Sequence, residues 1–114
     1  MSECIFCKMA NHELKVPFLY EDDNFFAIND IKPQAPSHFL IITKEHIPSV
    51  LDIDTDKESI FGKVFTIANK LAREYSLADK GFRLVNNCLK EGGQEVLHMH
   101  FHVLGGRQML WPPG

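Results

Sequence analysis

The sequence predicts an α+β fold in which a long helix covers one face of a mainly antiparallel sheet of five strands. Residues 55–75 carry the one strong helical pattern of the chain, with apolar residues at helical spacing. The rest contains five short segments of strand composition, separated by turn residues such as Gly, Pro, Asn and Asp. A chain of 114 residues has the length of one domain, so we expect a single domain over residues 1–114.

The region before the long helix is expected to hold a short helix and three strands. Residues 5–12 are the expected first helix. The segment FLYEDDNFFAIND reads as two strands around a turn at residues 21–24, where the turn chemistry comes from Asp22, Asp23 and Asn24. DIKPQAP is expected to be a loop, because Pro33 and Pro36 lack a backbone donor. SHFLIIT follows as a largely buried strand.

The second half is expected to hold the long helix and the last two strands. One apolar stripe runs along the helix, formed by Ile60, Phe61, Val64, Phe65, Ala68, Leu71, Ala72 and Tyr75. Thr55 and Glu58 have the spacing of a capping box, which predicts the helix start. Gly81 marks the entry into the fourth strand, FRLVNN, and LHMHFHV is the fifth.

Three of the six histidines occupy alternate positions in the segment LHMHFHVLGG. This alternation is typical of a half-buried strand, with Met99, Phe101 and Val103 facing a core and the imidazoles facing the opposite way. Along a strand, residues i and i+4 lie about 13 Å apart. His98, His100 and His102 therefore cannot all bind one metal ion, and at least one must have another role.

Composition and charge exclude several classes of function. The net charge of -3 argues against bulk nucleic-acid binding, although not against binding one nucleotide. No apolar run approaches the roughly 18 residues of a membrane span. The N-terminus lacks the pattern of a secretory signal, which favours the cytoplasm. In that reducing compartment we expect no structural disulfides between Cys4, Cys7 and Cys88.

Other groups are candidates for a site around the histidine row. The glycines of EGGQE, residues 91–95, let backbone N–H groups approach an anion such as phosphate. Asn87 could reach the same place or be an ordinary turn residue, and Asp30 could bind ribose hydroxyls or cap its own loop. Cys4 and Cys7 have zinc-ligand spacing, but one such pair is half a site.

The segment HMHFHVL resembles the signature of the histidine triad (HIT) family, and the similarity covers nearly the whole chain. It includes DIKPQAPSHFLIITKEHIPS, GFRLVNN, GGQEVLHMHFHVLGGRQ and the terminal WPPG. The ending RQMLWPPG is similar to the Hint branch, whose members are purine nucleoside phosphoramidases. The resemblance implies a five-stranded antiparallel sheet with two helices per protomer. It also implies a homodimer with a ten-stranded sheet, and a purine nucleotide, AMP or GMP or their phosphoramidates, as substrate.

The resemblance also implies roles for single residues. His100 would be the nucleophile that attacks phosphorus and forms a nucleotidyl-histidine intermediate. The catalytic set would comprise His100, His102, His38 and His98, with His38 behind the nucleophile to fix its tautomer. The nucleotide-binding set would comprise Phe6, Asp30, Ile31, Asn87, Gly93, Gln94, Glu95, His100 and His102. Glu95 departs from the animal-type pattern, which has a serine here that assists the leaving group.

For the metal, the resemblance implies one structural zinc ion per chain and no organic cofactor. The ligands would be Cys4, Cys7, His46 and His98. His98 would then turn to the metal while His100 and His102 face the nucleotide, which resolves the geometric problem of the row. Two further functions remain open from the sequence: a dinucleoside polyphosphate hydrolase or nucleotidyl transferase of the same superfamily, and a nucleotide-binding interaction protein.

Overall fold

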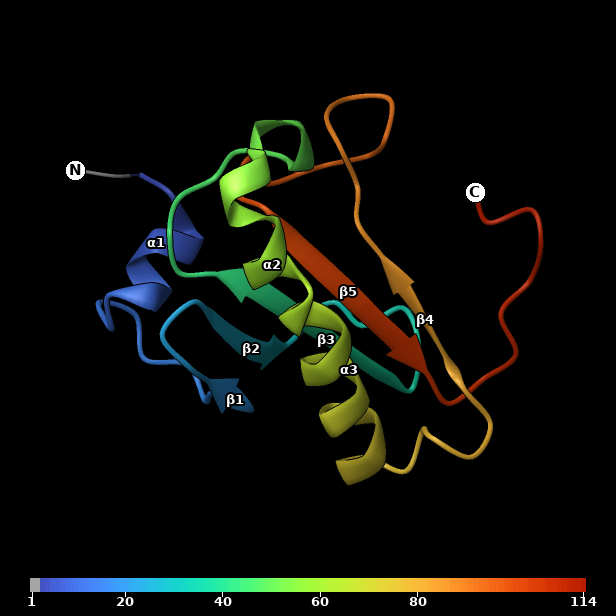
Figure 1. Ribbon diagram of the computed structural model, residues 1–114. Coiled ribbons are helices and arrows are strands. Elements are labelled where there is room, and N and C mark those ends of the chain that lie inside the picture. Colours follow the sequence, from blue (N-terminus) through green and yellow to red (C-terminus); the bar gives the residue numbers. More distant parts are fainter. Residues whose placement is uncertain (1–2) are drawn as a thin grey trace.

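A five-stranded antiparallel sheet forms the centre of the molecule, as expected from the sequence (Figure 1). The computed structural model describes residues 3–114. The strands are β1 (Tyr20–Glu21), β2 (Phe25–Asn29), β3 (Ser37–Thr43), β4 (Phe82–Val85) and β5 (His100–Gly105). Their order in the sheet is β1-β2-β3-β5-β4, and every neighbouring pair is antiparallel. The last strand in sequence therefore lies between β3 and β4.

One helix precedes the first strand, and the other two lie in the connection from β3 to β4. They are α1 (Ile5–Ala10), α2 (Glu58–Phe61) and α3 (Lys63–Glu74), preceded by two short 3-10 turns, Val50–Asp52 and Thr55–Lys57. The first helix is confirmed but ends before His12, whose φ is 62°. No helix within residues 3–114 is long and apolar enough to cross a membrane.

The long helix differs from its prediction in three respects. It is interrupted at Gly62, between α2 and α3. The capping box is made by Ser49 and Asp52 at the first 3-10 turn, so the expected box at Thr55 and Glu58 is wrong. The buried stripe of α3 consists of Val64, Ile67, Ala68, Leu71 and Ala72. Ile67 was not assigned to the stripe, while Phe65, which was, is 62% exposed.

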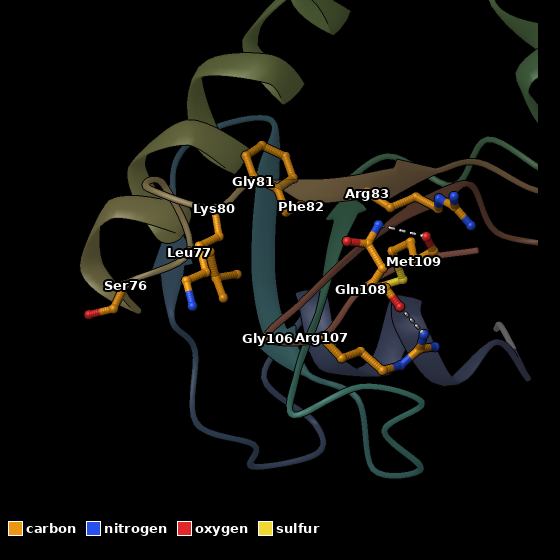
Figure 2. Close-up of a pocket in the computed structure, with 10 residues that line it drawn as sticks. All are labelled: Ser76, Leu77, Lys80, Gly81, Phe82, Arg83, Gly106, Arg107, Gln108 and Met109. Carbon is orange, nitrogen blue, oxygen red and sulfur yellow. Dashed lines mark hydrogen bonds between the residues drawn. The ribbon is translucent and has the colours of Figure 1, made fainter. Parts of the chain in front are cut away.

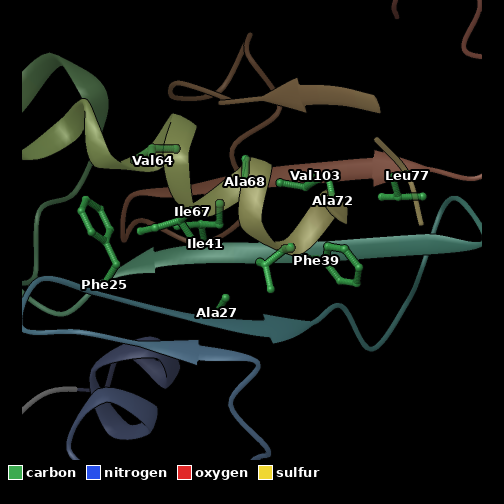
Figure 3. Packing of buried hydrophobic residues seen from close by; sticks show 11 residues of the cluster. Phe25, Ala27, Phe39, Ile41, Val64, Ile67, Ala68, Ala72, Leu77 and Val103 are labelled. Atoms are coloured by element: carbon green, nitrogen blue, oxygen red, sulfur yellow. The ribbon is translucent and has the colours of Figure 1, made fainter. Parts of the chain in front are cut away.

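Two hydrophobic clusters lie on opposite faces of the sheet. Figure 3 shows the larger one, in which α3 packs on Phe25, Ala27, Phe39, Ile41 and Val103. The second cluster joins Phe6 and Met9 of α1 to Phe26, Ile28, Leu40 and Ile42. Successive residues of β2 and β3 alternate between the two clusters, which is the period of a strand buried on both sides.

The turn between β1 and β2 forms as the sequence predicts. The Oδ1 atom of Asp22 accepts hydrogen bonds from the backbone N–H groups of Asn24 and Phe25, at 2.7 and 2.8 Å. Such a side-chain bond replaces a backbone bond and reverses the chain. The fifth strand, in contrast, begins later than expected. His98 and Met99 precede β5, although the N–H of Met99 still donates to the carbonyl of Ile47 at 2.7 Å.

Candidate active site and metal centre

The histidines of β3 and β5 share the face of the sheet opposite α3. In the antiparallel register, His100 pairs with Ile42 and His102 pairs with Leu40. Residues that pair directly point to the same face, so both imidazoles lie on the side of the second cluster. His38 lies two residues before Leu40 on the same face. The sheet register therefore gathers three histidines from two strands, of which only the β5 pair was visible as a sequence pattern.

Backbone contacts fix the orientation of the His100 ring. Its Nδ1 atom lies 2.7 Å from the carbonyl oxygen of His98. A carbonyl only accepts, so Nδ1 carries the proton and Nε2 keeps its lone pair. His38 bonds His102 instead, at 2.8 Å between Nε2 and Nδ1. The expectation that His38 fixes the tautomer of His100 is therefore wrong, since the His98 carbonyl does so.

Buried His38 and partly buried His102 form a pair beside a carboxylate. The Oδ2 atom of Asp30 lies 3.4 Å from Nε2 of His38 and 4.0 Å from Nδ1 of His102. Burial is the main cause that lowers the pKa of His102 to about 4; the nearby His100 and His38 lower it further and Asp30 opposes the shift. Burial also lowers the pKa of His38, against the effect of Asp30. Both rings are therefore neutral at pH 7.

Four potential metal ligands meet in a separate metal-ligand cluster. They come from the N-terminal end of α1, the loop after β3 and the segment before β5. The Nδ1 atom of His98 lies 3.2 Å from Sγ of Cys4, 3.5 Å from Sγ of Cys7 and 3.1 Å from Nδ1 of His46. Cys7 Sγ also lies 3.2 Å from Nδ1 of His46. Ligand atoms around a tetrahedral zinc ion are about 3.3–3.8 Å apart, given Zn–N of about 2.0–2.1 Å and Zn–S of about 2.3 Å. These four residues could hold a metal ion.

The orientation of His98 suits a metal ligand. Its Nε2 atom lies 2.7 Å from the carbonyl oxygen of Thr43, so Nε2 carries the proton and donates. The Nδ1 lone pair is then directed at the thiols and at His46. A ring whose second nitrogen donates to a carbonyl is the usual arrangement of a metal-bound histidine. The ring itself is completely buried, which excludes a role as an exposed polar residue.

The loop from Leu89 to Val96 is held by its own hydrogen bonds. The side chain of Gln94 accepts from the N–H of Leu89 and donates to the carbonyls of Pro48 and Val96. The N–H groups of Gly93 and Gln94 donate to Lys90 and Leu89 carbonyls. The expectation that all the backbone from Gly93 to Glu95 faces phosphate is therefore too broad. Within residues 3–114, the N–H of Glu95 is the one of these three amides without a hydrogen-bond partner.

Three other residues expected to contact the nucleotide, Asn87, Phe6 and Ile31, lie in different environments. Asn86, which the sequence reading overlooked, donates from Nδ2 to the carbonyl of His100 at 2.9 Å. The pairing of β4 with β5 ends at Val85 and His102, so Asn87 lies two residues beyond the last pair. Phe6 is buried and packs edgewise on His98 and His100, with ring centroids 5.7 and 5.1 Å away. Ile31 is 89% exposed and available to a ligand.

An open cavity of about 850 Å³ lies away from the histidines, at the end of β5 (Figure 2). Its lining comes from Ser76, Leu77, residues 80–83 and residues 106–109. Two arginines there hold neighbouring segments, because Arg83 donates to the carbonyl of Leu110 and Arg107 to that of Gln34. Its lining contains no histidine, cysteine, aspartate or glutamate side chain. The chemistry therefore concentrates on the histidine face.

Comparison with known proteins gives consistent results. The model of the HIT domain family matches residues 11–109. A purine nucleoside phosphoramidase of Escherichia coli (strain K12) is 43% identical over 107 residues, which cover 94% of this chain and 90% of that protein. The crystal structure of a HIT family hydrolase from Legionella pneumophila Philadelphia 1 has a TM-score of 0.94 and 47% identity, covering 98% and 100% of the two chains. A histidine triad protein from Clostridium difficile has a TM-score of 0.91 and 42% identity, covering 96% of each.

Proposed function

The chain belongs to the HIT domain family, and on this premise we propose that it hydrolyses the P–N bond of purine nucleoside 5′-phosphoramidates. The observation that carries the proposal is the orientation of His100. Its Nδ1–H is held by the His98 carbonyl, which leaves the Nε2 lone pair for attack. The similarity to a phosphoramidase at 43% identity supports this substrate class over others.

The reaction would proceed in two displacements. Nε2 of His100 forms a bond to the α-phosphorus while the P–N bond breaks, and the amine leaves after taking up a proton. Water then attacks the same phosphorus, the N–P bond to His100 breaks, and the nucleoside monophosphate is released. Imidazole suits both steps, since it is nucleophilic near neutral pH and leaves readily once bound to phosphorus.

The groups around His100 would bind the nucleotide. His102 and the N–H of Glu95 would donate to phosphoryl oxygens, with Asn87 beside them. Such fixed donors stabilise charge that develops in the transition state. Asp30 would accept from ribose hydroxyls through Oδ2, since its Oδ1 is already occupied by the N–H of Lys32. Exposed Ile31 would contact the base, and the exposed carboxylate of Glu95 would influence the choice of leaving group.

We infer that the group formed by Cys4, Cys7, His46 and His98 binds a structural zinc ion. Two sulfur and two imidazole ligands are typical of zinc, and a closed set of four leaves no position for a substrate. The ion would be held by Cys4, Cys7, His46 and His98. It would tie the start of α1 to the segments that follow β3 and precede β5. Thiolate ligands require reduced cysteines, which supports a cytoplasmic location.

A homodimer is part of the proposal. Strand β4 lies at one edge of the sheet, so its outer backbone groups could pair with a second copy. Pairing of two such edges would join the sheets into one of ten strands. We expect no nucleic acid or membrane as a partner, since the net charge of -3 does not attract polyanions.

The test compares turnover of adenosine 5′-phosphoramidate with that of diadenosine polyphosphates, using the wild type and His100→Ala. We expect the phosphoramidate to be the better substrate by kcat/KM, and the variant to be inactive on both. A preference for the diadenosine compounds would favour a polyphosphate hydrolase instead. Equal, trace turnover by both proteins would indicate a nucleotide-binding protein without this mechanism.

A further inference from the structure

A backbone amide fixes the proton of His38. The N–H of Gln34 donates to Nδ1 of His38 at 3.0 Å. Because an amide nitrogen only donates, Nδ1 of His38 must hold a lone pair. The only proton of the neutral ring is then on Nε2. His38 is 5% exposed, so this amide is the partner that determines the tautomer.

The proton of His38 in turn fixes that of His102. The Nε2 atom of His38 lies 2.8 Å from Nδ1 of His102, which is hydrogen-bond length. With its proton on Nε2, His38 donates and Nδ1 of His102 accepts. A proton on Nδ1 of His102 would face the proton of His38 at that distance. His102 is therefore neutral, with its proton on Nε2.

We propose that the Gln34 amide and His38 form a positioning relay, which holds His102 as a hydrogen-bond donor to the phosphoryl group. This inference rests on the proposed function and deepens it. His100 and His102, two residues apart on one face of β5, then have opposite tautomers. The His98 carbonyl gives His100 a bare Nε2 for attack, and His38 gives His102 a protonated Nε2 for donation.

The opposite tautomers are what the reaction requires. Charge grows on the phosphoryl oxygens in the transition state, and a donor already in place stabilises it without reorganisation. A bare Nε2 on His102 would repel those oxygens. A cationic His102 is disfavoured, because Nε2–H of His38 donates to its Nδ1 and because burial penalises the charged ring. The carboxylate of Asp30, 4.0 Å from Nδ1 of His102, acts in the opposite direction.

The loop that carries the Gln34 amide is itself anchored. Arg107 donates to the carbonyl of Gln34 from Nε and Nη2, at 3.3 and 3.0 Å. The N–H of Asp30 donates to the carbonyl of His38 at 2.9 Å, which closes the other end of the loop onto β3. These bonds hold the amide in line with His38, so the relay extends to the segment that follows β5.

Nitrogen NMR of the wild-type protein tests the relay without substrate. At pH 7, ¹⁵N shifts of the labelled histidines should place the protons of His38 and His102 on Nε2 and that of His100 on Nδ1. A coupling across the hydrogen bond should connect Nε2 of His38 to Nδ1 of His102. A proton on Nδ1 of His102, or a charged His102 at this pH, would overturn the inference.

Two matched variants test the role of the donor in turnover. His38→Gln keeps an N–H that can reach His102, whereas His38→Met has similar length and no donor. We expect His38→Gln to retain most of kcat and His38→Met to lose about 10- to 100-fold, with a smaller change in KM. Equal losses in both would show a merely structural role and overturn the inference.

The two parts of the experiment separate this inference from the proposed function. The NMR measurement needs no turnover and no variant, so it decides the tautomers even if a variant fails to fold. A protein that shows the expected tautomers but no phosphoramidase activity would refute the proposed function alone. An active protein with the proton of His102 on Nδ1 would refute the relay alone.

Discussion

The carbonyl oxygen of His98 lies 2.7 Å from Nδ1 of His100, while the ring of His98 faces Cys4 and Cys7. One residue thus connects two sites: its backbone orients the ring of His100, and its side chain completes the set of potential metal ligands. The late start of β5 explains this arrangement. Because His98 lies outside the strand, its ring can leave the row that His100 and His102 continue.

A covalent intermediate on His100 is the first prediction. Mass spectrometry of wild-type protein quenched during turnover should show a nucleotidyl adduct on His100. His100→Ala should show none and lose at least about 10³-fold in kcat, because the Nδ1 lone pairs of the neighbouring His38 and His102 already accept hydrogen bonds. AMP should still bind to the variant, since the phosphate and ribose contacts come from other residues.

His12→Ala is the matched control for this prediction. His12 lies at the surface beyond α1, with its side chain 65% exposed, and it contacts Glu21 rather than the histidine face. Its replacement should leave the adduct and the rate unchanged. An adduct that persists in His100→Ala would exclude this nucleophile.

The second prediction concerns acid stability. His102 has a lowered pKa in the folded protein, about 4 against the ordinary 6.5, because it is buried. Between these values the unfolded chain binds more protons, so this residue makes stability rise with pH and fall as pH drops from about 6.5 to 4. In His102→Asn, whose Oδ1 can still accept from His38, unfolding free energies should fall less steeply, by at most about 1.4 kcal/mol per pH unit.

Urea unfolding at pH 4.5, 5.5 and 6.5 measures this difference. The other titratable groups are present in both proteins, so their contributions cancel in the comparison. Parallel pH dependences for the two proteins would show that His102 is not neutral in the folded state.

The third prediction tests which residues of α3 form the core. Ile67 is 3% exposed and packs in the larger cluster, whereas Phe65 is 62% exposed. Ile67→Ala should lower the unfolding free energy by about 2–5 kcal/mol, as expected for a large-to-small change in a core. Phe65→Ala should cost less than about 1 kcal/mol. Equal losses in urea titrations would contradict the orientation of the helix.

That helix also shows where a sequence pattern stops being informative. The period of 3.6 residues identifies the helix and most of its buried face, including Leu71 and Ala72. The edges of the stripe remain ambiguous, because Phe65 and Ile67 are both apolar and lie on opposite sides of it. Only the packing of α3 on the sheet decides between them.

In the site, too, some features can be predicted from the sequence and others cannot. Alternation in β5 predicts that His100 and His102 share a face, and the CxxC spacing points to a metal. The partner of His102 could not be predicted this way, since His38 is distant in sequence and meets it only through the β3–β5 register. The roles of the Gln34 amide and the Thr43 carbonyl also could not be predicted from the sequence, because these backbone groups do not depend on the residue type.

The fourth prediction concerns the segment after β5. Trp111 is 81% exposed in the single chain, and Arg83 anchors the preceding carbonyl of Leu110. In the proposed dimer this segment would reach the leaving-group side of the partner's site. Removing residues 111–114 should therefore change selectivity among amine leaving groups more than AMP affinity. Unchanged selectivity in a truncated protein that is still dimeric would contradict this role.

The last prediction concerns the metal. Cys4→Ser with Cys7→Ser should abolish metal binding and lower the melting temperature, because binding to the folded chain alone adds directly to its stability. Elemental analysis of the wild type should find about one zinc ion per chain. Catalysis at a permissive temperature should fall much less than in His100→Ala, since the carbonyl of His98 still accepts from His100 when its ring has no metal. Cys88→Ser, outside the ligand set, should keep both metal and stability. Absence of zinc from protein expressed with it, or immediate loss of turnover on chelation while the protein stays folded, would contradict a structural role.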